Sequence, residues 1–222
     1  MTKHTGTSAG QMPAGITYDA VVLAGGRATR LGGTTALGDT AKAGLVVEGE
    51  RLLDRALRAT SRAGTAVVVG PPELADVLTG VRPQPVLTQE DPPFGGPVAG
   101  LAAGLRVLPA AGAPWVLVLA VDVPHAAGAI ALLEQAVSRE PTDGAYLVRE
   151  GRAQWLVGIY RRAALASVLA GIEPAGASMK RLVGELRCAE VPDPAGWSDD
   201  IDTPADAERL GAAADDYRKD PR

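Results

Sequence analysis

A glycine-rich segment that also carries cations, Val21 to Gly33 (VVLAGGRATRLGG), is the first part of the chain that could do chemistry. Gly25 and Gly26 follow an apolar run directly, and glycine lets a backbone turn sharply and present its N–H groups without a Cβ in the way. Arg27 and Arg30 add guanidinium groups that suit phosphate oxygens. The segment is neither a Walker A loop nor a G-x-G-x-x-G fingerprint. Its spacing favours an anion site over the alternative, a glycine-rich connection with surface arginines.

A second glycine-rich segment, Thr88 to Leu105 (TQEDPPFGGPVAGLAAGL), leads into a helical pattern. Pro97 suits the first turn of a helix, and a helix N-terminus behind a glycine pair binds anions or ligands readily. Asp91, just before it, could accept hydrogen bonds from a nucleobase edge. The alternative for Asp91 is a residue that stabilises the turn, and the residues alone favour that alternative.

Carboxylates mark two further segments, and the first of these ends a strongly apolar run. Asp122 follows WVLVLAV, where burying a charge is costly unless it is paired or bound to a metal. Hard cations such as Mg²⁺ take one or two carboxylates together with substrate phosphates. The alternative is that Asp122 caps the helix that follows Pro124.

The second acidic segment, WSDDIDTPADAERL, holds Asp199, Asp200 and Asp202 ahead of a Thr-Pro pair. Threonine before proline is a strong helix start, and this explains the pair without any function. The three carboxylates could favour the dipole of that helix. Alternatively, they could supply a second metal ligand opposite Asp122.

A sheet has to position these four segments. Apolar runs such as AVVV and WVLVLAV are typical of strands buried on both faces of a parallel sheet, and the helical patterns between them predict right-handed crossovers. The pattern predicts a three-layer α/β/α domain, in which ligands bind outside the carboxyl ends of the strands. Strands are predicted at Ala20–Ala24, Ala66–Val69, Gln84–Leu87, Trp115–Val121, Ala145–Val148 and Leu156–Tyr160, and helices at Leu52–Arg62, Glu73–Leu78, Val98–Leu108, Ala127–Arg139, Arg162–Leu169, Met179–Leu186 and Pro204–Ala213.

The later strands break the parallel pattern. The segment GAYLVREGRAQWLVGIY predicts two strands joined by a turn at Glu150-Gly151-Arg152, and hence an antiparallel hairpin. We therefore expect a mostly parallel sheet with one reversed strand, or a small sub-layer beside the parallel core. A single domain is predicted over residues 18–214, after a disordered lead of residues 1–17 and before a charged tail of residues 215–222.

Composition argues against several classes of function. The chain has 222 residues and a formal net charge of −4, so nothing suggests a protein built to coat nucleic acid. Its first residues lack the apolar region of a secretory signal, and no apolar stretch is long enough to span a membrane. We therefore expect a cytoplasmic protein with no nucleic-acid or membrane partner.

Taken in chain order, the segments resemble those of the MobA-like nucleotidyltransferases, and most closely the molybdenum cofactor guanylyltransferases. The matching pieces are LAGGRATRLGG with Lys42, EDPPFGGPVAGL, VDVP, QWLVGIYRR and DIDTPAD, from Leu23 to Asp206. The set in this order is specific for the superfamily and less so for the substrate. The resemblance implies a Rossmann-like nucleotidyltransferase fold and an enzyme that joins GMP from GTP to molybdopterin, releasing pyrophosphate. It also implies transient contact with other cofactor-biosynthesis proteins.

The resemblance assigns residues to nucleotide binding, to catalysis and to the binding of a metal ion. The metal ion would be Mg²⁺, with Mn²⁺ as a possible replacement. For nucleotide binding, backbone atoms near the glycines would hold guanine, and the cations would lie against the triphosphate. The nucleotide would contact Leu23, Ala24, Gly25, Gly26, Arg30, Lys42, Asp91 and Asp122, catalysis would use Arg30, Lys42 and Asp122, and the metal would bind Asp122. Asp202 is the candidate for a second metal ligand, because DIDTPAD has aspartates where family members commonly have asparagines, and the sequence does not decide between Asp202 and Asp200.

This chain departs from the family pattern in its lysine loop and at one nucleotide contact. Thr34 to Thr40 lengthen the loop, so that Lys42 lies twelve positions after Arg30, where family members place the lysine closer. Gly70-Pro71-Pro72 stands where many members carry an asparagine, and that contact is not carried over. Cytidylyl transfer, transfer to another phosphorylated metabolite, and a nucleotide-binding partner protein without catalysis remain alternatives.

Overall fold

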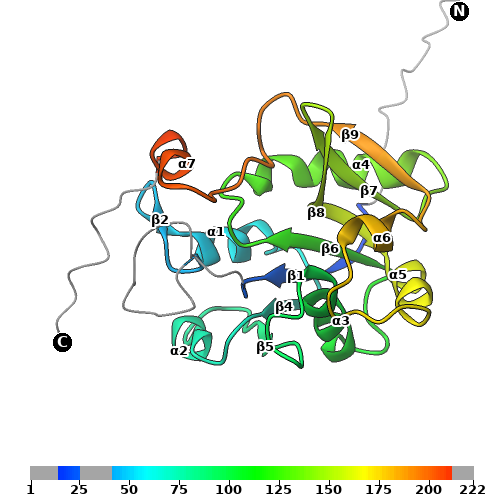
Figure 1. The fold of residues 1–222 in the computed structure, drawn as a ribbon, viewed down its shortest axis with the longest axis horizontal. Helices are drawn as coiled ribbons and strands as arrows, with labels where there is room; N and C mark the ends of the chain where they lie inside the picture. Colours follow the sequence, from blue (N-terminus) through cyan, green and yellow to red (C-terminus); the bar gives the residue numbers. More distant parts are fainter. Residues whose placement is uncertain (1–14, 26–41, 212–222) are drawn as a thin grey trace, which may run out of the picture.

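A seven-stranded sheet organises the part of the chain that the computed structural model describes, residues 15–25 and 42–211. In space the strands follow the order β5-β4-β1-β6-β8-β7-β9 (Figure 1). Among these seven, β8 alone is reversed, because it pairs antiparallel with β6 and β7 while the other pairs are parallel. The predicted mostly parallel sheet with a late antiparallel hairpin is confirmed. The strands are β1 (Tyr18–Leu23), β4 (Ala66–Val69), β5 (Val86–Thr88), β6 (Trp115–Ala120), β7 (Gly144–Arg149), β8 (Arg152–Arg161) and β9 (Cys188–Pro192).

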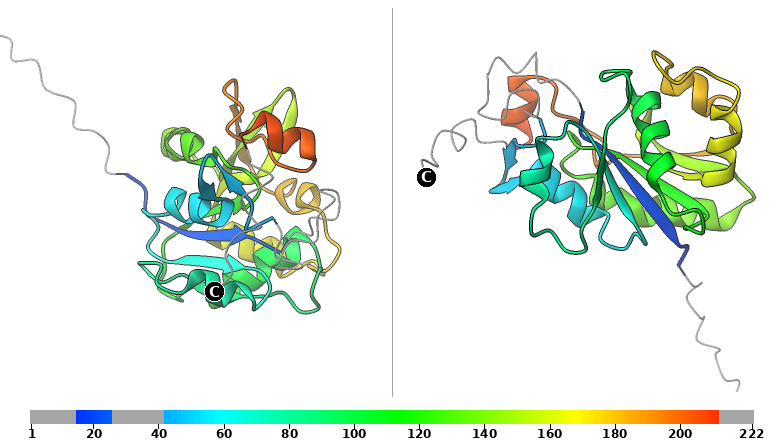
Figure 2. Two further views of the ribbon diagram at one scale, coloured as in Figure 1. Left: turned by 90° about the vertical axis from the view of Figure 1, so that its left-hand side faces the viewer. Right: turned by 90° about the horizontal axis from the view of Figure 1, so that it is seen from below.

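Helices cover both faces of this sheet, and the right-hand view of Figure 2 shows β1 between the two helical layers. One layer holds α3 (Pro97–Val107), α5 (Arg162–Leu169) and α6 (Met179–Val183), which share an apolar cluster with β1, β4, β6 and β8. The other holds α1 (Leu52–Ala59), α2 (Leu74–Leu78) and α4 (Ile130–Arg139). The short 3₁₀ helix η2 (Ala126–Ala129), the helix α7 (Pro204–Arg209) and the hairpin of β2 (Val46–Val47) and β3 (Glu50–Arg51) complete the description.

The side chains of β1 point alternately to the two faces of the sheet, so this one short strand packs against both helical layers. Ala20 and Val22 belong to the clusters under α4 and α1, whereas Val21 packs under α3, and all three side chains are fully buried. Successive side chains of a strand point to opposite faces, so a strand buried on both sides must be apolar at every position.

The order in which the chain adds strands to the sheet changes direction between the parallel neighbours β1 and β6. From β1 the chain extends the sheet through β4 to β5 with α1 and α2 on one face, and it then returns over α3 on the other face to reach β6 (Figure 1). Ligands of open α/β sheets bind outside the carboxyl ends of the strands at such a reversal. The glycine-rich turn after Leu23 and the carboxylate of Asp122 both lie at this point.

Several predicted element ends are wrong, and two strand regions were missed. The helix predicted to end at Leu186 stops at Val183 before Gly184, and the helix predicted to begin at Ala127 begins as the 3₁₀ turn η2. The edge strand β9 is half exposed and contains Glu190 and Pro192, so it lacks the continuous apolar pattern of the inner strands. The β2–β3 hairpin is too short to show a pattern.

The predicted amino-terminal lead and carboxy-terminal tail fall largely outside the described residues. Residues 1–14 and 215–222 are not described, while Ile16 packs against the cluster beneath α4. None of the helices in the described ranges has the length and apolarity of a membrane span.

Two glycines bring α3 unusually close to β1. A Cβ built on Gly100 would lie 3.2 Å from Leu23 Cδ2, and one built on Gly104 would lie 2.7 Å from Val21 Cγ1. These glycines are one helical turn apart, so they share the face of α3 that meets the sheet. The close approach places the amino end of α3 beside the carboxyl end of β1.

We expect Gly104→Ala to lower the free energy of unfolding by about 1–2 kcal/mol, because overpacking against buried Val21 outweighs the gain of about 1 kcal/mol in helix propensity. Chemical denaturation measures this change. Arg106→Ala, at an exposed position of the same helix, serves as the control and should stay within about 0.5 kcal/mol of the wild type. Equal stability of Gly104→Ala and wild type would contradict the close packing.

Candidate functional site

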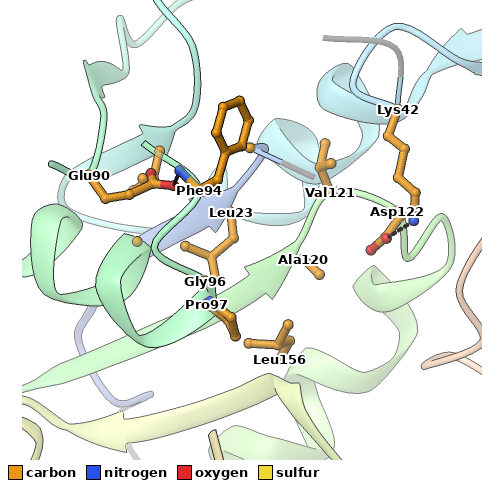
Figure 3. Close-up of a pocket in the computed structure, with 13 residues that line it drawn as sticks. Leu23, Lys42, Glu90, Phe94, Gly96, Pro97, Ala120, Val121, Asp122 and Leu156 are labelled. Atoms are coloured by element: carbon orange, nitrogen blue, oxygen red, sulfur yellow. Dashed lines mark hydrogen bonds and ion pairs between the residues drawn. The ribbon is translucent and has the colours of Figure 1, made fainter. Parts of the chain in front are cut away.

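A pocket of about 400 Å³ lies at the carboxyl ends of β1 and β6, beside the amino end of α3 (Figure 3). Small-molecule sites usually fall between about 300 and 1,000 Å³. The wall is largely apolar and carries charged groups at separate places. Its described residues are Leu23, Gly25, Lys42, Val69, Glu90, Phe94, Gly96, Pro97, Gly100, Ala120, Val121, Asp122 and Leu156.

Lys42 lies between two carboxylates at one end of this pocket. Its Nζ is 2.7 Å from Asp122 Oδ2 and 2.5 Å from Asp202 Oδ1, and the residue is only 7% exposed. Burial opposes the charge of the ammonium group, but the ion pairs with Asp122 and Asp202 outweigh it and raise the pKa of Lys42. The residue is therefore a fixed cation, and the structure places it in the pocket despite its distance from Arg30 in sequence.

Asp122, Asp200 and Asp202 form a cluster around this lysine. One carboxylate oxygen from each lies within 4.8 Å of the others. Partial burial, followed by the negative charges of Asp202 and Asp122, raises the pKa of Asp200. An all-oxygen set of this kind suits a hard divalent cation such as Mg²⁺, which prefers carboxylate ligands.

A backbone hydrogen bond and a buried side chain hold the acidic loop at the end of β6. The N–H of Ile201 donates to the carbonyl of Asp122 at 3.0 Å, and the Ile201 side chain is fully buried against the core under α1. Asp200 and Asp202 flank this anchored isoleucine and so reach the same cluster. The alternative role of Asp122 as a helix cap is not supported, because His125 occupies the cap position of η2.

A buried aspartate, Asp193, holds the start of the same loop. Its carboxylate accepts hydrogen bonds from the N–H of Trp197 at 3.0 Å, and from the N–H and hydroxyl of Ser198 at 2.8 and 2.6 Å. Burial alone would raise the pKa of Asp193, but these hydrogen bonds outweigh it and lower the pKa. Asp193 therefore fixes the turn that leads into the metal-binding candidates.

The structure separates the carboxylates that the sequence left equivalent. Asp199 pairs with Arg149 at 3.1 Å and with Arg209 at 3.0 Å, so it serves the fold of the loop. Thr203 caps α7 in a reciprocal capping box with Asp206, as the Thr-Pro signal predicts. Asp200 and Asp202 remain for the cluster.

The turn after β1 lies in the wall of the pocket, where the resemblance expects a nucleobase. Leu23 and Gly25 line the pocket. The carbonyl of Leu23 accepts from the N–H of Val121 at 3.0 Å, and the N–H of Ala24 donates to the carbonyl of Val69 at 2.7 Å. Because the N–H of Ala24 is already bonded within the sheet, a base contact at this turn would use backbone carbonyl oxygens or the backbone of Gly25.

The loop before α3 contributes a residue that sequence reasoning missed. Asp91 is exposed and lies outside the described pocket wall, whereas its neighbour Glu90 lines the pocket. Glu90 Oε1 accepts a hydrogen bond from the N–H of Phe94 at 3.0 Å, and Phe94 also lines the pocket. Adjacent acidic residues in a loop carry no periodic signal that could have told them apart.

Gly26, Arg27, Arg30 and the segment from Thr34 to Thr40 lie outside the described residues. The expected roles of Gly26 and Arg30 therefore stay predictions.

A second pocket, of about 470 Å³, also reaches Asp122 and extends toward β8 and α6. It shares Pro97, Ala120, Asp122 and Leu156 with the first pocket. Its remaining wall carries polar and aromatic groups, among them Gln154, Trp155, Ser178, Ser198 and Asp200. Residues of the cluster therefore line two neighbouring spaces, each large enough for a small molecule.

Comparisons with known proteins agree with this geometry. A family profile, the MobA-like NTP transferase domain, matches residues 20–190. The chain is 34% identical over 168 residues to a probable molybdenum cofactor guanylyltransferase of Opitutus terrae, a match that covers 74% of this chain and 77% of the relative.

Two solved structures share the fold. One is a molybdopterin-guanine dinucleotide biosynthesis protein A of Archaeoglobus fulgidus, with a TM-score of 0.61 and 20% identity over 87% of this chain and 96% of the other. The second is a 2-C-methyl-D-erythritol 4-phosphate cytidylyltransferase of Thermus thermophilus, with a TM-score of 0.56 and 22% identity over 86% of this chain and 96% of the other.

We expect Asp193→Asn to lower the free energy of unfolding at pH 7 by about 1–3 kcal/mol, because an amide cannot accept all three hydrogen bonds and presents donors to donors. A lowered pKa means that the carboxylate stabilises the fold fully above its ordinary pKa of 3.8, and that this contribution is lost as the pH falls through the lowered value. The deficit of the variant should shrink at low pH in denaturation series.

Asp76→Asn is the matched control for this change, because Asp76 is exposed on α2. It should stay within about 0.5 kcal/mol of the wild type. A deficit of Asp193→Asn that is the same at low pH and at neutral pH would show that side-chain shape matters there rather than charge.

Proposed function

Because this chain belongs to the MobA-like NTP transferase family, we propose that it transfers GMP from GTP to molybdopterin and releases pyrophosphate. Its chemistry is nucleotidyl transfer, and its relative in Opitutus terrae is named for the guanylyl reaction. The single observation that carries the proposal is the contact of Lys42 with Asp122 and Asp202 in a pocket at the reversal of strand order. A fixed cation beside a carboxylate cluster is what a triphosphate and its metal ion require.

Asp122 and Asp202 are the proposed ligands of Mg²⁺, with Asp200 close enough to join them. The donor set fits this ion because every available ligand atom is a carboxylate oxygen. When bound, the ion would neutralise negative charge on the phosphates as the reaction proceeds. Mn²⁺ takes similar oxygen ligands and could replace it.

Lys42 would hold the triphosphate and stabilise the charge of the leaving pyrophosphate. In the proposed reaction a phosphate oxygen of molybdopterin attacks the α-phosphorus of GTP in line, and the bond to the β-phosphate oxygen breaks. The nucleophile is already an anion, so no general base is needed. Arg30, outside the described residues, remains proposed as a second cation on the phosphates.

The second pocket supports a two-substrate reaction at this cluster. Asp122 borders both pockets, so a nucleotide in one and an acceptor in the other would meet beside it. Trp155 and Gln154 offer an aromatic surface and amide groups to a heteroaromatic acceptor such as a pterin.

Cytidylyl transfer is the second candidate, because the solved neighbours include a cytidylyltransferase with the same fold. A nucleotide-binding protein without catalysis has less support. That alternative rests on the lengthened loop before Lys42, but Lys42 nevertheless lies in the pocket. We also propose a cytoplasmic enzyme that works without nucleic acid or membrane and passes its product to other cofactor-biosynthesis proteins.

Calorimetric titration with GTP, CTP, ATP and UTP, each with and without Mg²⁺, tests the nucleotide. We expect GTP to bind most tightly and Mg²⁺ to strengthen its binding, since the metal ion would relieve the repulsion between phosphates and carboxylates. A preference for CTP would keep the chemistry and change the product. Absence of any nucleotide binding would contradict the proposal.

Lys42→Ala and Asp122→Asn should each lower turnover with GTP and molybdopterin by about a hundredfold or more, because each removes a charge that faces the reacting phosphates. Release of pyrophosphate measures turnover, and circular dichroism checks the fold. Lys180→Ala, at an exposed lysine of α6, is the matched control and should retain activity. Undiminished turnover of Lys42→Ala would refute the role given to this lysine.

A further inference from the structure

Glu90 is a second carboxylate in the pocket wall, away from the cluster around Lys42. Figure 3 shows Glu90 and the Lys42–Asp122 pair at opposite ends of the wall. Glu90 lies beside the turn after β1, since a Cβ built on Gly25 would be 3.9 Å from Glu90 Oε1. If the phosphates lie at the Lys42 end, as the proposed function requires, the base must lie at the Glu90 end.

Apolar surfaces surround Glu90 at that end. Leu23 and Val69 line the pocket from the sheet, and Gly100 lines it from α3, where a side chain would fill the space. Phe94 also lines the pocket and is nevertheless 50% exposed. A pocket end with apolar walls and one charged acceptor suits a base with hydrogen-bond donors on its edge.

The same carboxylate holds the phenylalanine in place. Phe94 has a positive φ of 64°, a left-handed conformation that is unfavourable for any residue with a side chain. Its N–H donates to Glu90 Oε1 at 3.0 Å (Figure 3), which helps to keep the backbone in this conformation. Glu90 and Phe94 therefore form one unit at the mouth of the pocket.

The chemistry of a carboxylate distinguishes the four common bases. An ionised carboxylate only accepts hydrogen bonds, and it has acceptor positions left after one bond from Phe94. Guanine presents two adjacent donors, N1–H and the 2-amino group. The pairing edges of adenine and cytosine place a ring-nitrogen acceptor beside their single amino donor, and uracil places its one N–H between two carbonyls, so these bases bring acceptors against the charge.

We propose that Glu90 selects guanine by accepting hydrogen bonds from N1–H and the 2-amino group of GTP, while Phe94 covers the base. This inference rests on the proposed function and specifies its nucleotide. The acidic residue that contacts the base is then Glu90, which lines the pocket, and not its exposed neighbour Asp91, which the family resemblance indicated.

Calorimetry with three purine triphosphates and Mg²⁺ tests the contact. GTP has the 2-amino donor, inosine triphosphate lacks it, and xanthosine triphosphate carries a carbonyl there. The wild type should bind GTP about tenfold or more tightly than inosine triphosphate, the effect of one hydrogen bond to a charged group. In Glu90→Gln this ratio should fall toward one, and binding of xanthosine triphosphate should improve, because the amide can donate to the carbonyl.

Glu73→Gln is the matched control, because Glu73 is exposed before α2 and should keep the wild-type ratio. If Glu90→Gln also keeps the ratio while the wild type still prefers GTP, the inference is overturned and guanylyl transfer stands. If the wild type prefers CTP, both fail. A thermal melt checks that each variant is folded.

Phe94→Leu provides a second measurement. Loss of an aromatic cover should weaken GTP and inosine triphosphate alike, by roughly tenfold, and leave their ratio unchanged. A change in the ratio instead would mean that Phe94, and not Glu90, discriminates between the bases. Affinities equal to those of the wild type would remove Phe94 from the base site.

Discussion

Compensation of charge at the carboxyl edge of the sheet is the constraint on which the rest of the site depends. Three carboxylates lie within 4.8 Å of one another, from segments that are about eighty positions apart in sequence. Such a group is costly to assemble unless a cation lies among them. Lys42 meets this need in the structure, and a divalent ion with a triphosphate would meet it during the proposed reaction. The loop anchored by Ile201 and Asp193 holds Asp200 and Asp202 close to Asp122.

The sheet places this charged cluster at one end of a pocket whose other end is built by different elements. Because strand order reverses between β1 and β6, the turn after Leu23 and the carboxylate of Asp122 meet at one edge. Gly100 and Gly104 let α3 approach β1 closely, which brings the loop with Glu90 and Phe94 to the far end of the same pocket. The charged groups proposed to bind the phosphates and the metal ion therefore lie at one end of the pocket. Apolar walls and the carboxylate of Glu90 lie at the other end. A nucleotide has the same division along its length.

Much of this arrangement could be predicted from local sequence. Continuous apolar runs identify β4 and β6 as inner strands, and Thr203 before a proline identifies the start of α7. Asp122 stands out because it follows seven apolar residues. By contrast, β9 at the edge of the sheet has no such pattern, because its side chains are only partly buried or are exposed. Asp199, Asp200 and Asp202 look alike in sequence, and only their distant partners, Arg149 for the first and Lys42 for the last, distinguish them.

By itself, the sequence determined the fold class, the family and the segments that make the site, because periodicity, glycine placement and an isolated carboxylate are local properties. The tertiary structure decided which members of each segment take part. It placed Glu90 rather than Asp91 in the pocket wall, and it brought Lys42 to Asp122 and Asp202. The physical reason is that a side chain's position in a loop depends on long-range packing and backbone hydrogen bonds, which leave no periodic trace in the neighbouring residues.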